Sequence, residues 1–269
     1  MTTRKLANPS AGAKESHRGP GWRLLGTVLL VSQLAAFPAP AADLMVAAAA
    51  SLTNAFTDIG KAYEKATPGT RVLFNFASSG QLLQQISRGA PVDVFATADL
   101  ETMDRAEKQR LIVHSSRVNF AANRLALIVP GDSKLEISKL QDLTSPQVQR
   151  IALGTPDSVP AGRYAKAALE KAGLWQDLTP KFIFTQNVRQ SLDYVFRGEV
   201  DAGFVYATDA AVSPVKVRTA VDVPLENPIV YPIAAVKGFG NLNQALEFIA
   251  FVRSDAAQAI LTKYGFLKP

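Results

Sequence analysis

The chain has 269 residues, of which 48% are hydrophobic and 19% charged, so it is long enough for one large or two medium domains with hydrophobic cores. This composition excludes a disordered, collagen-like or coiled-coil protein, and the absence of cysteine excludes disulfides, thiolate metal centres and cysteine nucleophiles. The formal net charge is +6, so the position of the basic residues decides whether nucleic-acid binding is to be expected.

The amino terminus has the pattern of a secretory signal peptide. Residues 1–23 are rich in Lys and Arg, residues 24–37 form an uncharged and mostly apolar run, and small residues follow as Ala39-Pro40-Ala41. This order of regions is typical of an exported protein. A membrane-spanning helix needs about 20 apolar residues, and two prolines interrupt this run too early. We therefore predict a signal peptide at residues 1–42, with cleavage near Ala41 or Ala42.

Removal of this leader changes the charge balance. It holds five of the 29 basic residues and one of the 23 acidic residues, which leaves 24 basic and 22 acidic residues. The mature chain then carries a net charge of about +2, and no basic cluster with interleaved aromatic residues follows. We therefore expect no nucleic-acid partner. Because no cysteine is available for lipidation, we expect a soluble periplasmic or extracellular protein without a lipid anchor.

The first half of the mature chain alternates between strand and helix patterns. A short apolar run at Leu44–Ala47 is followed by apolar residues at helical spacing up to Tyr63. The same pair of patterns begins again at Val72–Phe76 and at Val92–Ala96. Repeated strand–helix units of this kind predict a mostly parallel sheet that is covered on both faces.

A second series of strands and helices begins at Leu125–Val129. The further predicted strands are Ile151–Leu153, Phe182–Phe184, Ala202–Tyr206 and Ile229–Val236, with helical patterns between them and two more helical stretches at the end of the chain. No Gly/Ser-rich or Pro-rich linker separates the two series. The sequence therefore predicts two α/β lobes of roughly 100 residues each, joined by short connections.

Small polar residues stand where predicted strands end and helices begin. Ser51 is a predicted N-cap after the first strand, and Ser78-Ser79-Gly80 follows the second. In the second series, Val159-Pro160-Ala161-Gly162 opens one helix and Asn187 is a predicted cap of the next. Helix N-termini present free N–H groups and positive dipole ends, so four such junctions facing one crevice would form an anion site. Taken singly, each of these residues is better explained as a simple cap, and it is their recurrence in both series that supports a ligand site.

The sequence offers little support for catalysis or for a metal cation. His114 is the only histidine outside the leader and is expected on the surface. No nucleophile elbow, zinc-protease motif, EF-hand or phosphate-binding glycine loop is present. Asp93 and Asp99 stand near a strand end, where a helix cap or a hydrogen bond between lobes is favoured over cation binding. We therefore expect a protein that is not an enzyme and that has neither a cofactor nor a bare metal ion.

Several segments resemble the periplasmic molybdate-binding proteins of ABC transporters. In chain order these segments are Ala47–Leu52, Phe76–Gly80, Gly89–Phe95, Thr97–Asp99, Val159–Lys166, Asn187–Arg189, Gly203–Tyr206 and Lys263–Phe266. The resemblance spans essentially all of the mature chain, and it is specific through the combination of segments. It implies an α/β fold with two lobes, two chain crossovers (type II) and a ligand cleft between the lobes. Lobe I would comprise residues 43–121 and 225–269, and lobe II residues 122–224.

The resemblance also implies a function and a set of binding residues. Such a protein captures molybdate, commonly with tungstate, and delivers it to an ABC-transporter permease with its cytoplasmic ATPase; we expect a monomer. Matching motif positions imply that Ser51 and Ser79 offer hydroxyl and amide groups. They imply further that Ala161 and Val188 offer backbone amides and that Tyr206 offers its phenol. Gly80 departs from the family pattern, which often has a small polar residue at this position.

Three alternatives stay open at this point. A site made only of donors rejects oxyanions that keep a proton, such as hydrogen phosphate, but sulfate differs from molybdate mainly in size. A carrier of sulfate, thiosulfate or another oxyanion is therefore the first alternative. The second is a periplasmic enzyme on a related scaffold, although the relative of this fold that builds tetrapyrroles requires a cysteine. The third is a sensory module, which a fused transmembrane or signalling segment would favour.

Overall fold

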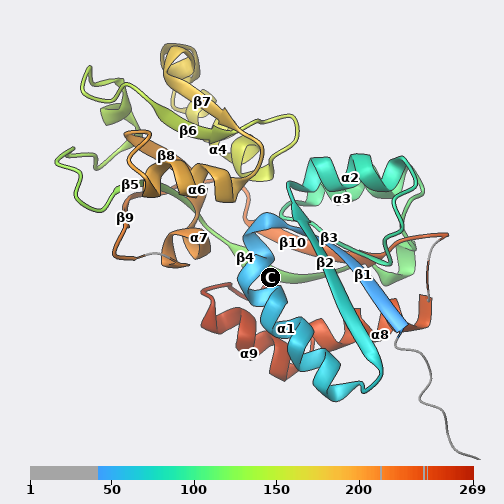
Figure 1. The fold of residues 1–269 in the computed structure, drawn as a ribbon. Helices are drawn as coiled ribbons and strands as arrows, with labels where there is room; N and C mark the ends of the chain where they lie inside the picture. Colours follow the sequence, from blue (N-terminus) through green and yellow to red (C-terminus); the bar gives the residue numbers. More distant parts are fainter. Residues whose placement is uncertain (1–41, 213, 239, 241) are drawn as a thin grey trace, which may run out of the picture. The chain divides into compact units, whose positions relative to one another are not determined.

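The computed structural model describes residues 42–212, 214–238, 240 and 242–269 (Figure 1). The predicted signal peptide lies outside the described residues except for Ala42, and it stays a prediction. Within the described ranges, no helix combines the length and the apolar character that crossing a membrane requires. The chain divides into residues 1–38 and residues 39–269, and everything below concerns the second unit.

The first sheet has five strands in the order β2-β1-β3-β10-β4 (Figure 1). Its strands are β1 (Ala42–Ala49), β2 (Thr70–Ala77), β3 (Val94–Ala96), β4 (Val118–Asn123) and β10 (Ile229–Ala235). The helices that belong with it are α1 (Thr53–Ala66), α2 (Ser79–Ser87), α3 (Leu100–Lys108), α8 (Leu242–Val252) and α9 (Asp255–Lys263). We call this sheet and its helices the first lobe.

The second sheet has five strands in the order β7-β6-β8-β5-β9. Its strands are β5 (Leu125–Pro130), β6 (Ile151–Gly154), β7 (Phe182–Thr185), β8 (Ala202–Tyr206) and β9 (Val217–Val223). Its helices are α4 (Pro160–Lys171), α5 (Trp175–Leu178), α6 (Val188–Phe196) and α7 (Ala207–Val212). Short 3-10 helices also occur in the described chain. In the first lobe these are η1 (Ala50–Leu52) and η2 (His114–Ser116), and beside the second sheet they are η3 (Leu140–Thr144) and η4 (Thr179–Lys181). We call this sheet and its helices the second lobe.

The predicted parallel pairing is confirmed for the strands of the strand–helix units, but each sheet is mixed because one further strand runs antiparallel to its neighbours. In the first lobe β1 pairs in parallel with β2 and β3, whereas β10 runs antiparallel to both β3 and β4. The second lobe repeats this arrangement, with β5 antiparallel to β8 and β9. In each sheet the antiparallel strand, β10 or β5, is the first strand that the chain forms after it crosses from the other sheet. The antiparallel pairs therefore arise where the chain passes between the lobes.

The chain passes between the two sheets twice. Arg124 alone joins β4 to β5, and residues 224–228 join β9 to β10. Two crossings and two α/β sheets confirm the predicted fold class. The boundaries predicted after residues 121 and 224 were drawn from the sequence, and they stay predictions.

Helices cover both faces of the first sheet, as predicted. Residues of β1 contribute to two different hydrophobic clusters. Val46 belongs to the cluster that contains Phe56 of α1, whereas Ala47 belongs to the cluster that contains Leu82 of α2. Each fully buried large apolar side chain stabilises the fold by roughly 1.5–3 kcal/mol, so this double coverage holds the strand ends in fixed positions.

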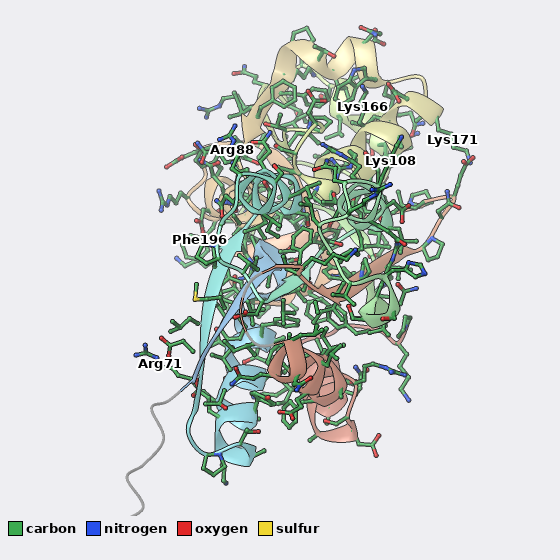
Figure 2. The ribbon with its side chains drawn as sticks, turned by 90° about the vertical axis from the view of Figure 1, so that its right-hand side faces the viewer. Arg71, Arg88, Lys108, Lys166, Lys171 and Phe196 are labelled. Carbon is green, nitrogen blue, oxygen red and sulfur yellow. The ribbon has the colours of Figure 1, made fainter. Side chains whose placement is uncertain are left out.

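Several basic side chains of the first lobe lie on its outside. Arg71 on β2, Arg88 after α2 and Lys108 on α3 are exposed and project away from the ribbon (Figure 2). They come from three different elements, and none of them lines the site described below.

Candidate functional site

Six junctions between a strand and the following helix, three from each sheet, surround one small cavity. The first lobe contributes Ala49, Ala50, Ser51, Ser78, Ser79 and Ala98, and the second lobe contributes Val159, Pro160, Ala161, Val188 and Tyr206. All five residues predicted to bind the ligand, Ser51, Ser79, Ala161, Val188 and Tyr206, are therefore brought together.

The strand register explains why distant residues meet at this cavity. In the first sheet Ala49 at the end of β1 lies opposite Ala77 at the end of β2, and Ala48 lies opposite Ala96 at the end of β3. The three parallel strands therefore end together. In the second sheet Gly154 and Thr185 likewise end β6 and β7 side by side. The residues that follow these ends lie along the C-terminal edges of the parallel strands.

Helix starts supply backbone donors at three of these junctions. Ser78 is the N-cap of α2, and Asn187 caps α6 by accepting a hydrogen bond from the amide of Gln190 at 3.1 Å. Pro160 occupies the first turn of α4, as predicted. The first N–H groups of a helix have no partner within it and lie at its positive end, so the amides of Ala161 and Val188 suit an anion.

The prediction that Ser51 caps a helix is wrong. The helix α1 begins at Thr53, and Ser51 lies within the 3-10 turn η1. Thr53 Oγ1 donates to the carbonyl of Ala50 at 2.7 Å, which stabilises this tight entry into the helix. The hydroxyl of Ser51 instead lies 3.0 Å from the hydroxyl of Tyr231 on β10.

The side-chain hydroxyls at the cavity are buried. Ser79 Oγ accepts a hydrogen bond from the amide of Ala98 at 3.1 Å. The hydroxyls of Ser78 and Tyr206 are buried and have no hydrogen-bond partner in the part of the chain that the structure describes. Burial raises the pKa of Tyr206 well above its ordinary value, so the phenol keeps its proton. Two unpaired buried hydroxyls at one cavity indicate a site that a polar ligand completes.

The cavity carries no formal charge of its own. Among the described residues that line it there is no Asp, Glu, His, Lys or Arg. Arg163 and Arg189 lie nearby, but Arg163 pairs with Asp99 at 2.6 Å and Arg189 pairs with the buried Asp209 at 2.6 Å. The lining therefore offers neutral N–H and O–H donors, which suit a small anion and provide no group for acid–base catalysis.

Several hydrogen bonds join the two lobes beside the cavity. The amide of Gly80 donates to the carbonyl of Ser158 at 2.9 Å. Arg163 on α4 donates to Asp99 and to Thr102 Oγ1, at 2.6 and 2.8 Å. Arg189 on α6 donates to Asn54 Oδ1 at 2.7 Å. These bonds hold the six junctions against one another, so the site depends on both lobes.

The residues weighed for other roles have structural ones. Asp99 caps α3 by accepting from the amide of Thr102 and also bonds Arg163 of the other lobe, as favoured from the sequence. Asp93 accepts from the amide of Met45 at 2.7 Å. His114 is exposed, as predicted, and lies beside Glu107. In the described part of the chain no group of three His, Cys, Asp or Glu residues is placed to hold a metal ion.

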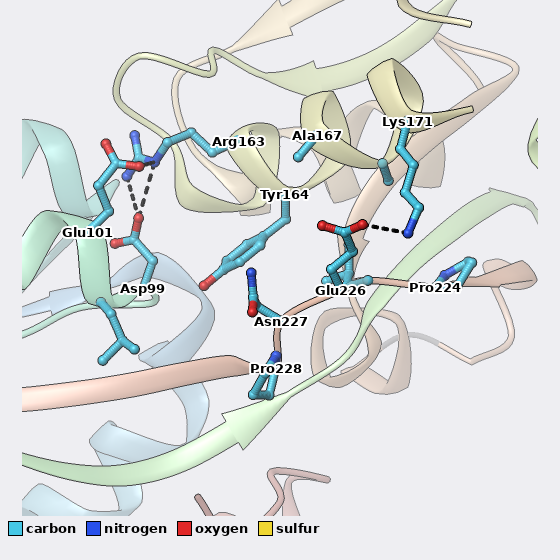
Figure 3. Close-up of a pocket in the computed structure, with 13 residues that line it drawn as sticks. Asp99, Glu101, Arg163, Tyr164, Ala167, Lys171, Pro224, Glu226, Asn227 and Pro228 are labelled. Atoms are coloured by element: carbon cyan, nitrogen blue, oxygen red, sulfur yellow. Dashed lines mark hydrogen bonds and ion pairs between the residues drawn. The ribbon is translucent and has the colours of Figure 1, made fainter. Parts of the chain in front are cut away.

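A second and larger pocket of about 450 Å³ lies between α3, α4 and the crossing at residues 224–228 (Figure 3). It shares no lining residue with the smaller cavity. Figure 3 shows the bond from Arg163 to Asp99 on one side and the ion pair of Lys171 with Glu226, at 2.6 Å, on the other. These pairs satisfy the charges of its walls, whereas the smaller cavity has unpaired donors, so we place the candidate site in the smaller cavity.

The predicted binding residues did not include the lining residues Ser78 and Ala98 or the supporting residue Tyr231. Ser78 stood within a predicted junction, but the resemblance pointed to Ser79. Ala98 follows the third predicted strand as Ser51 follows the first, so the same rule applied there would have found it. Tyr231 lies within a predicted strand, and nothing in the local sequence indicates that its hydroxyl meets Ser51.

Comparisons with known proteins agree with this architecture. The family model of bacterial extracellular solute-binding proteins matches residues 44–267. The molybdate-binding protein ModA of Haemophilus influenzae is 36% identical over 247 residues, which cover 90% of this chain and 96% of that protein. The putative ABC transporter substrate-binding lipoprotein YvgL of Bacillus subtilis is 38% identical over 83% of this chain and 85% of its own length.

A solved structure supports the fold. The periplasmic molybdate-binding protein of Azotobacter vinelandii superposes with a TM-score of 0.76 at 24% identity, and the match covers 84% of this chain and 99% of that one. At this level of identity the likeness shows a shared fold. Given the family match and relatives at 36% and 38% identity, the chain belongs to the bacterial extracellular solute-binding proteins, which are binding proteins and not enzymes.

Proposed function

We propose that this protein captures molybdate in the periplasm and delivers it to the permease of an ABC transporter, whose cytoplasmic ATPase drives import. The observation that carries the proposal is the cavity at the six junctions, with its neutral donors and the unpaired hydroxyls of Ser78 and Tyr206. The ModA relatives, which are named for molybdate binding, support the choice of ligand.

In this proposal the oxygens of molybdate accept hydrogen bonds from the cavity lining. Ser51 and Ser79 donate from the first lobe, and the amides of Ala161 and Val188 donate from the second together with the phenol of Tyr206. Hydrogen bonds to a charged group contribute about 1.5–3 kcal/mol each, so several of them hold a dianion without a cationic side chain. No cofactor or bare metal ion takes part; molybdenum enters only as the oxyanion.

Tungstate has the same charge and shape as molybdate, and we propose that it binds as well. Sulfate also has this charge and shape but is smaller, so its rejection depends on how closely the lobes approach. Hydrogen phosphate keeps a proton that would face a donor, and binding it would leave that proton without an acceptor.

We also propose a monomer that works without a lipid anchor. The relative YvgL is named as a lipoprotein, but the present chain contains no cysteine that could carry a lipid. Nucleic acid is not a proposed partner, because the basic excess lies mainly in the first 42 residues.

Calorimetric titration of the wild-type protein and of the double variant S51A/S79A tests this proposal. We expect one molybdate per wild-type chain, not displaced by sulfate, and a loss of affinity of at least about a hundredfold in the double variant, because two charge-assisted hydrogen bonds are removed. The variant S87A/S115A, which changes two exposed serines, should bind like the wild type.

Each other outcome has a defined meaning. Tight molybdate binding by S51A/S79A would show that the site has been placed wrongly. Binding of sulfate alone would keep the anion site but assign another ligand. Failure of the wild type to bind any oxyanion would contradict the proposed function.

A further inference from the structure

We propose that Tyr231, held by Asn123, is a positioning residue that fixes the hydroxyl of Ser51 as a donor toward the cavity and so sets the preference for oxyanions without a proton. This inference rests on the proposed function of the cavity as an oxyanion site. It concerns residues that do not line the cavity and act through Ser51.

Tyr231 is held firmly beneath the site. It lies on β10 with none of its surface exposed to solvent. Its ring packs edge-on against Phe120, Tyr206 and Phe266, with ring centres 6.3, 5.8 and 5.5 Å away. Such contacts leave the ring little freedom, so the position of its hydroxyl is fixed.

The neighbours of Asn123 fix the direction of the hydrogen bonds. Asn123 Oδ1 accepts from the amide of Arg124 at 2.9 Å. The Nδ2 group therefore faces the other way, where it lies 2.9 Å from Thr208 Oγ1 and 3.2 Å from the hydroxyl of Tyr231. Because an amide nitrogen only donates, the oxygen of Tyr231 accepts this bond.

The proton of Tyr231 then has one place to go. Among the described residues, Ser51 Oγ is the remaining polar atom within hydrogen-bond distance of the Tyr231 oxygen, at 3.0 Å. Burial raises the pKa of Tyr231 well above its ordinary value, so the phenol keeps this proton. Tyr231 therefore donates to Ser51, and the chain of bonds runs from Asn123 through Tyr231 to Ser51.

The direction of these hydrogen bonds determines whether Ser51 donates to the ligand or accepts from it. Ser51 accepts from Tyr231, so its own proton is left for the cavity. Ser79 is arranged in the same way, because it accepts from the amide of Ala98 at 3.1 Å. Both serines thus use an acceptor position within the protein and face the cavity as donors. Without the hydroxyl of Tyr231, Ser51 could rotate and accept a proton from the ligand.

The test compares molybdate with hydrogen phosphate in four variants. Y231F removes the hydroxyl that donates to Ser51, S51A removes the hydroxyl that accepts from it, and S51A/Y231F combines the two changes. Y63F is the matched control, because Tyr63 is another buried tyrosine, on α1, that does not line the cavity. Molybdate affinity is measured by calorimetry. Phosphate affinity is measured by displacement of molybdate, at a pH where phosphate is mainly the monohydrogen dianion.

We expect Y231F to lower the ratio of molybdate to phosphate affinity by about tenfold, the effect of one hydrogen bond. Y63F should leave the ratio unchanged, and adding Y231F to S51A should change it no further, because the effect passes through Ser51. Asn123→Ala keeps Tyr231 but removes the donor that directs it, and it should shift the ratio in the same direction even if Y231F folds poorly.

The contrary results are distinct from failure of the proposed function. If Y231F lowers both affinities by one common factor, or leaves both unchanged, Tyr231 does not direct Ser51 and the inference falls. A full effect of Y231F in the S51A background would overturn it as well. If the wild type binds no oxyanion, the proposed function fails, and the inference fails with it.

Discussion

Tyr206 keeps a buried hydroxyl that has no hydrogen-bond partner among the described residues. A buried polar group without a partner costs about 1–3 kcal/mol of folding free energy, so the ligand-free fold gains nothing from this hydroxyl. The nearby Tyr231 differs, because its hydroxyl is bonded to both Ser51 and Asn123. Two adjacent buried tyrosines thus have opposite roles: one is satisfied by the fold, and the other is left for the ligand.

The unpaired hydroxyl of Tyr206 predicts that its removal weakens ligand binding without weakening the fold. Tyr206→Phe should lower molybdate affinity by about tenfold to a hundredfold, because a donor to the anion is lost. It should leave the free energy of unfolding of the ligand-free protein unchanged or raise it by up to about 1 kcal/mol. Calorimetric titration and urea unfolding measure the two quantities. Reduced stability with unchanged affinity would mean that the hydroxyl serves the fold.

At the scale of elements, the sequence predicted the strands that are marked by a continuous apolar run. Ala202–Tyr206 matches β8 fully, because a continuous apolar run marks it. The strands β4 and β9 were missed. Both lie at an edge of their sheet, and β9 alternates irregularly between buried and exposed residues, so neither shows a continuous apolar run. The antiparallel pairs of β5 and β10 were also not predicted, since periodicity carries no information about strand direction.

The same distinction applies to the site. Junction residues could be predicted because a strand end followed by a helix start is visible in the local sequence. The contact between Ser51 and Tyr231 joins residues 180 positions apart, so only the fold reveals it. Ser51 was recognised as a site residue, but its bonding was mispredicted because a 3-10 turn, not α1, begins directly after the strand.

The close contact of α4 with β6 yields a prediction at this scale. A Cβ atom on Gly162 would lie 1.8 Å from the carbonyl oxygen of Gly154, so alanine there must displace the start of α4. Gly162→Ala should lower the free energy of unfolding by roughly 1–3 kcal/mol. It should also lower molybdate affinity by more than about tenfold, because the amide of Ala161 moves.

A second glycine of the same region separates the two effects. Gly173 follows α4 with a φ of 71° and has open space around it, so Gly173→Ala is strained but far from the cavity. Thermal unfolding should show that this variant is less stable than the wild type, and titration should show an unchanged molybdate affinity. Equal affinity of Gly162→Ala and the wild type would contradict the role given to the start of α4.

At the scale of the whole binding unit, the site exists only while the lobes are in contact. Arg163 and Asp99, with side chains 17% and 4% exposed, form a well-shielded bond between the lobes. Shielding makes such a pair stronger than an exposed one. Since ligand release requires the lobes to separate, this bond should slow dissociation.

Asp99→Asn tests this bond while sparing the helix, because asparagine caps α3 as well as aspartate does. We expect molybdate to dissociate about tenfold faster, in stopped-flow displacement, with little change in stability. Asp43→Asn removes a partner of Arg71 from an exposed pair within the first lobe and should leave the rate unchanged. An unchanged rate in Asp99→Asn would show that the bond does not limit opening.

In the proposed complex, donors from five of the six junctions hold one oxyanion between the lobes. A crystal structure of the protein grown with molybdate tests it most directly, because molybdenum can be located by its anomalous scattering. We predict a single molybdenum site in the cavity, with its oxygens within hydrogen-bond distance of Ser51, Ser79, Ala161, Val188 and Tyr206. Molybdenum elsewhere, or oxygens held by arginine or lysine side chains, would contradict the account.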